Sequence, residues 1–323
     1  VRDLGADGQL TPQRTGEGPP RVIVICGPTA VGKTAAGIEV ARACNGEIIG
    51  ADSMQVYRYM DIGTAKPTTA EQAAVRHHLI DVVDPDEPFD AAAYLTLGRR
   101  ALSDVIRRGK TPVVVGGTGL YIKALLHGLF RADARDPSVR ARLRTEAESQ
   151  GAAALHARLA QCDPQTAARL HPNDTLRILR ALEVFETTGR PISALQREHR
   201  FGDAPFCTLK IGLCLERETL YRRIDRRVEA MIAIGLEDEV RALLSRGYRP
   251  ELKAMQSIGY SHMTAFIAGA IRHADCVRTL QRDTRRFAKR QLTWFRADPD
   301  IRWRTPDRMA DLIRTSKQFL DLT

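Results

Sequence analysis

Residues 22–34 read VIVICGPTAVGKT, and this stretch joins three structural signals. Its first five residues, Val22 to Cys26, form an apolar, mostly β-branched run that is typical of a strand buried on both faces. A glycine-rich turn follows, and residues 35–43 then have the pattern of a helix. A buried strand, a turn and a helix in this order indicate an α/β fold with a parallel sheet.

Three further apolar runs predict strands of the same sheet. Residues 47–51 end at Asp52, residues 111–115 end at a Gly-Gly-Thr-Gly turn before a helix at 120–126, and residues 207–215 read CTLKIGLCL. Strands that alternate with helices imply crossover connections, with sites at the carboxyl ends of the strands. The expected fold class is therefore an α/β, P-loop NTPase-like parallel sheet flanked by helices, with an all-helical insertion.

The domain organisation follows from where the strand signals stop. Residues 131–200 contain only helical periods and turn signals, including a helix start at Asn173-Asp174. We therefore predict a catalytic core of residues 21–130 and 201–323, interrupted by a helical insertion at 131–200. Residues 1–20 lack an apolar period and are predicted to be a disordered tail.

Composition excludes several classes of protein. The chain has 323 residues, of which 43% are hydrophobic and 27% charged, and this excludes disordered, collagen-like and disulfide-stapled chains. No apolar run approaches the roughly 18 residues of a membrane span. The six cysteines lack metal spacing and are interpreted as buried, reduced thiols, which favours a cytoplasmic location.

Positive charge is concentrated after residue 130. Residues 1–130, 131–200 and 201–323 carry net charges of 0, +3 and +7, which account for the total of +10. A neutral block before a basic remainder suggests that catalysis and polyanion binding are divided between regions. The alternative is that these arginines are exposed to solvent on helix surfaces and bind no polyanion.

The turn after the first strand matches a phosphate-binding loop. Residues 27–34, GPTAVGKT, fit G-x-x-x-x-G-K-[ST] between a predicted strand and a predicted helix. Glycines let backbone N–H groups face phosphates, Lys33 adds a point charge, and the hydroxyl of Thr34 can ligate Mg²⁺. Asp52, at the end of another strand, can hold metal or accept a proton from a nucleophile, or serve only as a turn residue.

Several segments together resemble the bacterial tRNA dimethylallyltransferase (tRNA isopentenyltransferase) family. They are the phosphate loop, ADSMQVYRYMDIGTAKP at 51–67, HHLIDVVDP at 77–85, VVVGGTGLYIKALLHGL at 113–129, HPNDTLRILRALEV at 171–184, SIGY at 257–260 and AKRQLTWFR at 288–296. The resemblance implies transfer of the dimethylallyl group of dimethylallyl diphosphate to the exocyclic amine of the adenine 3′ of the anticodon in tRNA. Together with the phosphate loop and the composition, it gives the expected cofactor, Mg²⁺, and the expected partner, the anticodon stem-loop, with no membrane and a monomeric state.

The resemblance also implies roles for individual residues. Contacts to the donor diphosphate are expected from Gly27, Thr29, Ala30, Val31, Gly32, Lys33 and Thr34, with Thr34 also on the metal. Contacts to the target nucleotide are expected from Asp52, Ser53, Met54, Gln55 and Thr118. Further tRNA contacts are expected from Arg140, Leu176, Arg177, Ile178, Leu179 and Arg180, and on a partial match from Gln256–Ser261.

The chemistry adds candidates of its own. Charge that develops on the leaving diphosphate needs cations, and Arg217, Arg223 and Arg227 lie at one predicted helix start, with Arg223 preferred for catalysis and Arg217 for donor binding. Asp52 is the candidate base for the weakly nucleophilic adenine amine, with Lys33 and Thr118 as further catalytic residues. Phe287 and Trp294 share a helix face and are interpreted as core.

Three other functions remain open. A small-molecule or nucleotide kinase would use the loop for ATP, and an adenylate isopentenyltransferase would prenylate free adenine nucleotides without needing residues 131–200. A non-catalytic RNA-binding NTPase would leave Asp52 and the turn at 116–118 without a role. Labelled dimethylallyl diphosphate offered with tRNA or with AMP distinguishes these alternatives.

Overall fold

Six parallel strands form one sheet in the part of the chain that the computed structural model describes, residues 18–129, 136–199 and 205–321. Their spatial order is β3-β2-β4-β1-β5-β6. The strands are β1 (Arg21–Cys26), β2 (Gly46–Ala51), β3 (His77–His78), β4 (Thr111–Gly116), β5 (Cys207–Leu213) and β6 (Arg302–Arg304). The predicted parallel α/β sheet is confirmed.

Both faces of the sheet are covered, which explains the continuous apolar runs. Along β1, Val22 and Val24 belong to one hydrophobic core and Ile23 and Ile25 to the other, because successive side chains point to opposite faces. One core includes α1 (Lys33–Ala43) and α14 (Met309–Asp321), and the other includes α3 (Ala91–Arg107) and α4 (Gly119–His127). Each core strand is therefore buried from both sides.

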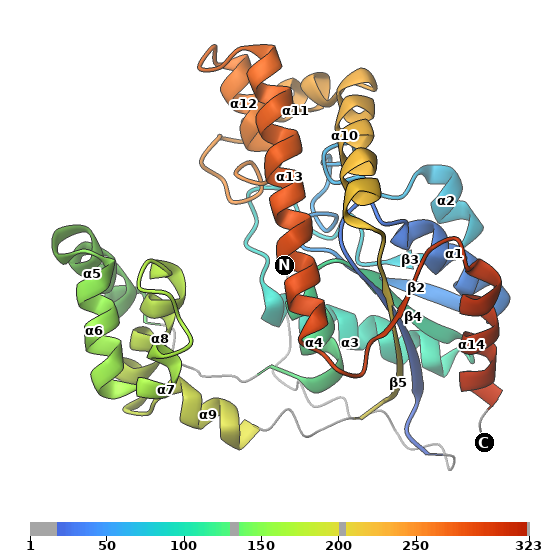
Figure 1. Cartoon of the computed structure of the whole chain (residues 1–323), viewed down its shortest axis with the longest axis horizontal. Helices are drawn as coiled ribbons and strands as arrows, with labels where there is room; N and C mark the ends of the chain where they lie inside the picture. Colours follow the sequence, from blue (N-terminus) through green and yellow to red (C-terminus); the bar gives the residue numbers. More distant parts are fainter. Residues whose placement is uncertain (1–17, 130–135, 200–204, 322–323) are drawn as a thin grey trace. The chain divides into compact units, whose positions relative to one another are not determined.

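The helices that follow β5 rise together past the sheet in Figure 1. They are α10 (Arg217–Ala233), α11 (Leu236–Ser245), α12 (Tyr260–Ile267) and α13 (His273–Arg296). The short α2 (Thr69–Ala74) comes earlier in the chain, after β2 and before β3. On α10, Leu220 and Ile224 belong to the α1 core and Val228 to the other core. The helix thus continues from the sheet into the group of helices beyond it.

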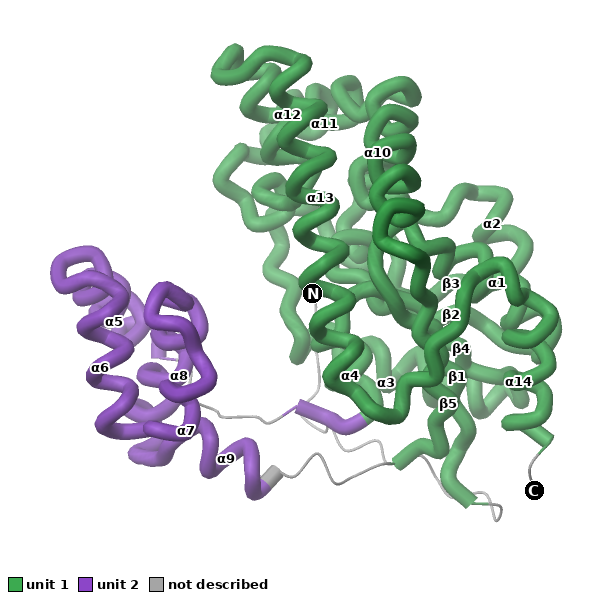
Figure 2. The backbone as a smooth tube through the Cα atoms, viewed as in Figure 1, with its two compact units in different colours: residues 1–126, 205–323 green, residues 127–204 purple. Residues whose placement is uncertain are grey.

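The chain divides into two compact units, 1–126 with 205–323, and 127–204 (Figure 2). The secondary-structure elements described in the second unit are helices joined by turns: α5 (Pro137–Gln150), α6 (Ala152–Cys162), α7 (Pro164–Ala167), α8 (Thr175–Thr188) and α9 (Ile192–His199). They bury a core of their own that includes Leu143, Leu159 and Ile178. The unit extends four residues beyond each end of the insertion predicted at 131–200.

Some expectations need correction or lie outside the described residues. The strands β3 and β6 and the helix α14 were not predicted from sequence. All six cysteines are free, but only Cys26, Cys44 and Cys276 are buried, whereas Cys162 and Cys214 are half-buried and Cys207 is exposed. Most of the predicted disordered tail, residues 1–17, lies outside the described residues. Within the described chain, every helix is too short or too polar to cross a bilayer.

Candidate active site

The phosphate loop has the backbone that its glycines allow. Gly27 has a φ of +143°, and an added Cβ there would lie 2.6 Å from the carbonyl oxygen of Leu213 on β5. Gly32, with a φ of +105°, precedes α1 and provides no side-chain cap. The N–H groups of the first turn of α1 therefore remain available to an anion.

Two cations and one carboxylate set the electrostatics beside this loop. The Nζ of Lys33 donates to the carbonyl oxygen of Pro28 at 2.7 Å, and Arg227 approaches the hydroxyl of Thr29 at 3.4 Å. Burial lowers the pKa of Lys33 to about 8, although the nearby Asp52 carboxylate opposes this shift. Burial also lowers the pKa of Arg227, again against the effect of Asp52. An anion bound here would raise the pKa of Lys33 again.

Asp52 is held in a defined orientation at the end of β2. Its Oδ1 accepts hydrogen bonds from the backbone N–H groups of Met54 at 2.9 Å and Gln55 at 3.4 Å. The hydroxyl of Thr118 accepts from the N–H of Ser53 at 3.1 Å, and the N–H of Thr118 donates to Ala51 at 3.1 Å. The bonds of Thr118 therefore join the ends of β2 and β4. Because Oδ1 of Asp52 is used by the turn, Oδ2 is the oxygen that can serve a substrate.

A cavity of about 590 Å³ opens between these groups. Its lining includes the predicted residues Thr29, Ala30, Gly32, Lys33, Thr34, Asp52, Ser53, Met54, Gln55 and Thr118, together with Arg227. Its apolar wall includes Val228 and Met231 of α10, Ile258 and Tyr260, and Leu280 and Phe287 of α13. Of the partial match at 256–261, residues 256–260 line the cavity. The volume is typical of a small-molecule site.

Three residues predicted to bind the donor, Gly27, Val31 and Arg217, and the predicted catalytic Arg223 do not line the cavity. Gly27 packs closely against Leu213 of β5, and the fully buried Val31 belongs to the core that includes α1. Arg223 donates to the carbonyl oxygen of Val31 at 3.4 Å, and Arg217 stacks over the ring of Tyr221. The sequence analysis preferred Arg223 to Arg227 as the catalytic arginine. In the structure, Arg227 is the arginine of α10 that lines the cavity.

Sequence reasoning assigned no role to Gln291, although it lies in the quoted AKRQLTWFR segment. Its Oε1 accepts from the N–H of Thr29 at 2.8 Å, and its Nε2 donates to the carbonyl oxygen of Gly117 at 2.9 Å. The buried amide therefore joins the phosphate loop to the turn that carries Thr118. The interpretation of Phe287 and Trp294 as core is wrong, since Phe287 lines the cavity and Trp294 is 46% exposed.

We expect Gln291→Met to lower the free energy of unfolding by about 1–3 kcal/mol, because a buried N–H and a buried carbonyl lose their partner. Urea unfolding followed by circular dichroism measures the change. Gln281→Met is the matched control, since Gln281 lies on the same helix and its amide makes only an exposed contact to Glu229. Equal stabilities of the two variants would contradict a bridging role for Gln291.

The residues expected to contact tRNA in the second unit differ in exposure. Arg140, Leu176 and Arg177 are exposed, and the ion pair of Arg177 with Asp174 lies at the surface. The side chains of Ile178 and Leu179 are buried in the core of the unit, and the tRNA contact expected of these two residues stays a prediction. Arg180 is half-buried and pairs with the buried Glu183 at 3.0 Å.

A divalent cation could use two oxygen donors of the cavity wall, the hydroxyl of Thr34 and the carboxylate of Asp52. Among the described residues, no group of three or more histidines, cysteines and acids is arranged to hold a metal. Mg²⁺ commonly binds through one or two protein oxygens together with substrate phosphates and water. The donor set fits such a shared site. His77 and His78 form strand β3, and the imidazole of His78 contacts Glu47 at 2.7 Å.

Comparison with known proteins gives one consistent family. The family model for IPP transferase matches residues 55–298. A tRNA dimethylallyltransferase of Desulfosudis oleivorans is 61% identical over 284 residues, covering 88% of this chain and 90% of the relative. One of Geobacter sulfurreducens is 54% identical over 283 residues, covering 88% of this chain and 91% of the relative.

Solved structures give the same result. A full-length tRNA isopentenylpyrophosphate transferase of Bacillus halodurans has a TM-score of 0.70 at 40% identity, covering 93% of this chain and 97% of that one. A eukaryotic dimethylallyltransferase acting on tRNA has a TM-score of 0.77 at 30% identity, covering 93% and 77% of the two chains.

Proposed function

Because the chain belongs to the IPP transferase family, we propose that it transfers the dimethylallyl group of dimethylallyl diphosphate to a tRNA. The acceptor is the exocyclic N6 amine of the adenine 3′ of the anticodon. The bond from the allylic C1 to the diphosphate oxygen breaks, the N6–C1 bond forms, and the amine loses a proton. The products are the N6-dimethylallyl adenosine and diphosphate.

The observation that carries this proposal is that one cavity combines phosphate-binding groups with a set of apolar side chains. The loop N–H groups, Lys33 and Arg227 suit a diphosphate, and the side chains of Val228, Met231 and Phe287 suit a short hydrocarbon chain. Asp52 lies on the cavity wall and close enough to Lys33 and Arg227 to affect their pKa values. The phosphate-binding groups alone would also suit a nucleoside triphosphate, and family membership together with the adjacent apolar side chains favours the prenyl donor.

Roles for the residues follow from the charges that the reaction creates. Lys33 and Arg227 stabilise negative charge on the leaving diphosphate, and Mg²⁺, held by Thr34 with Asp52 nearby, would supply further charge neutralisation. Asp52 accepts the proton of the amine through Oδ2. The hydroxyl of Thr118 keeps the Asp52–Gln55 turn in place through the N–H of Ser53.

The target adenine has to leave its stack to reach this cavity. Unstacking is least costly in a single-stranded loop, where sequence-specific RNA recognition also concentrates. We assign the helical unit, residues 127–204, to the anticodon stem-loop, with Arg140, Leu176 and Arg177 as exposed contacts. An enzyme that prenylates free adenine nucleotides has no use for such a unit.

The direct test is incubation with labelled dimethylallyl diphosphate and undermodified tRNA, with parallel reactions containing AMP or ATP. We expect label in tRNA alone. Label in AMP would favour the adenylate isopentenyltransferase, and ATP turnover without prenyl transfer would favour the kinase.

A second prediction concerns the helical unit. Arg140→Ala with Arg177→Ala should raise the KM for tRNA and leave the affinity for dimethylallyl diphosphate unchanged. If both arginines contact phosphates, the log–log salt dependence of tRNA binding becomes shallower by about two units. Arg180 is left in place because its removal would leave the buried Glu183 without this ion pair.

The control for this double variant is Arg190→Ala, an exposed arginine of the same unit that pairs with Glu198. It should bind tRNA like the wild type across the salt titration. A wild-type slope in the double variant would mean that Arg140 and Arg177 are solvent-exposed residues that do not contact tRNA phosphates.

A further inference from the structure

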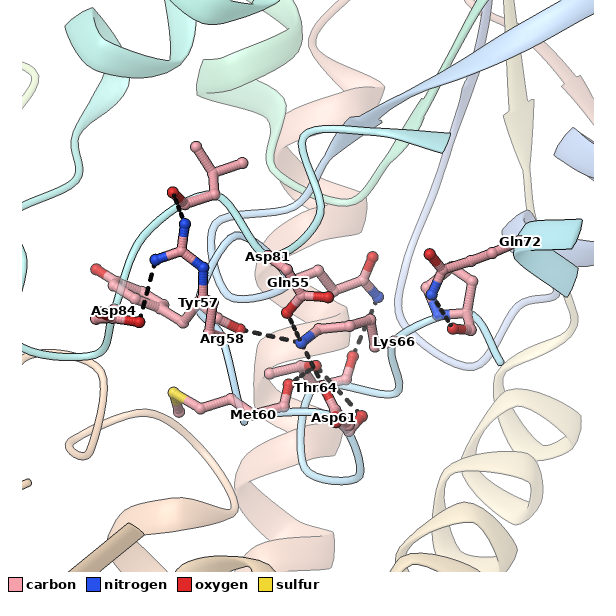
Figure 3. Close-up of polar contacts among 12 residues, drawn as sticks. Gln55, Tyr57, Arg58, Met60, Asp61, Thr64, Lys66, Gln72, Asp81 and Asp84 are labelled. Atoms are coloured by element: carbon pink, nitrogen blue, oxygen red, sulfur yellow. Dashed lines mark hydrogen bonds and ion pairs between the residues drawn. The ribbon is translucent and has the colours of Figure 1, made fainter. Parts of the chain in front are cut away.

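One wall of the cavity is an irregular loop, residues 52–68, between β2 and α2. Hydrogen bonds and ion pairs stabilise this loop, as Figure 3 shows. The Nζ of Lys66 donates to the carbonyl oxygen of Tyr57 at 3.0 Å and to Asp81 at 2.6 Å, and it also pairs with Asp61. The Nε2 of Gln55 donates to the carbonyl oxygens of Thr64 and Ala65 at 3.2 and 3.0 Å. These contacts fix the shape of the loop but do not attach it to the helices α11 and α12.

The hydrogen bonds between the loop and those helices are made by Glu239, in the first turn of α11. Tyr59 of the loop also packs against Arg246 and Tyr248 near the end of α11, without hydrogen bonds to the loop backbone. Its Oε2 accepts from the N–H groups of Asp61 at 2.9 Å and Ile62 at 2.7 Å. Its Oε1 accepts from the N–H of Gly63 at 3.1 Å and from the hydroxyl of Tyr260 at 2.6 Å. One carboxylate therefore receives four donors, three of which are consecutive backbone groups of the loop.

The fourth donor, Tyr260, is part of the cavity wall and is fully buried. Its ring lies against Gly63, where an added Cβ would approach Cε2 at 2.5 Å. Burial and the adjacent Glu239 raise the pKa of the Tyr260 hydroxyl, which therefore remains a donor. Glu239 thus joins the loop, α11 and the start of α12 at one point.

We infer that Glu239 is a positioning residue for the transfer reaction. By holding the backbone of residues 61–63 against Tyr260, it fixes the distance between the loop that carries Ser53–Gln55 and the apolar wall. Glu239 does not itself line the cavity. The inference rests on the proposed function, because the loop carries the proposed base Asp52 and the residues Ser53–Gln55, for which the family resemblance implies contacts to the target nucleotide.

Glu239→Gln tests it with little change in size. Glutamine has one acceptor oxygen and an NH₂ group, so an amide N–H would replace an acceptor and face backbone donors. We expect amide hydrogen exchange of residues 61–63 to accelerate by about tenfold or more, since about 1.4 kcal/mol of local stabilisation corresponds to that factor. The KM for tRNA should rise by a similar factor, while the dissociation constant for dimethylallyl diphosphate stays within about twofold.

Two further variants define the interpretation. Glu237→Gln, in the same helical turn, removes only a surface ion pair with Arg241 and should match the wild type in both measurements. Tyr260→Phe removes one of the four donors, keeps the ring, and should change exchange and KM in the same direction but less. It also supplies the test if Glu239→Gln does not fold.

Wild-type exchange at residues 61–63 in Glu239→Gln would overturn the inference. Faster exchange with an unchanged KM for tRNA would also overturn it, because the loop would then be attached without serving the substrate. Failure of the proposed function is separate: it would appear as absence of prenyl transfer to tRNA by the wild-type protein.

Discussion

Asp52→Asn is expected to lower the rate of dimethylallyl transfer by about 10²–10⁴-fold, the usual range for loss of a general base. The substitution is conservative here, because the amide oxygen of asparagine can still accept the N–H groups of Met54 and Gln55 that Oδ1 now accepts. What is lost is the ability to take the proton from N6. Single-turnover assays with both substrates saturating measure this step.

Binding of the two substrates separates this role from a structural one. We expect the KM for tRNA and the affinity for dimethylallyl diphosphate to change by no more than a few-fold in Asp52→Asn. Asp84→Asn is the matched control, since Asp84 pairs with Arg58 at 3.1 Å and does not line the cavity. A rate near that of the wild type would remove Asp52 from the proposed mechanism.

The central strands could be predicted because burial on both faces leaves a local signature. In β1, β2, β4 and β5 most side chains meet a core, so each strand reads as an apolar run. The edge strands β3 and β6 have two and three residues, and neither His77–His78 nor Arg302–Arg304 has an apolar pattern. They form because a neighbouring strand offers backbone partners, which local sequence does not encode.

The same contrast applies to the candidate site. Lys33, Asp52 and Thr118 follow the ends of parallel strands, and these ends meet at one edge of the sheet, so local motifs were enough to group them. Gln291 and Phe287 reach the cavity from α13, and Gln291 bonds to a residue 174 positions away in the chain. Helical periodicity shows which residues of α13 share a face but not what that face contacts.

Lys33→Met is expected to weaken binding of dimethylallyl diphosphate by about 10- to 150-fold, the equivalent of about 1.5–3 kcal/mol for a hydrogen bond to a charged group. The rate of transfer should also fall, because the same cation stabilises the leaving diphosphate. Isothermal titration with the donor alone measures the first effect. Unchanged affinity and rate together would mean that the loop binds something else.

The pH dependence gives an independent check on the same residue. In the free protein the pKa of Lys33 is about 8, so above that pH the amine is mostly neutral and must take up a proton when the diphosphate binds. The wild-type dissociation constant should therefore rise about tenfold per unit as the pH increases beyond 8, whereas phosphate groups, which titrate near pH 6, no longer change. Lys33→Met lacks this group, and its weaker affinity should be flat over the same range. An equal slope in both proteins would show that another group controls binding of the donor.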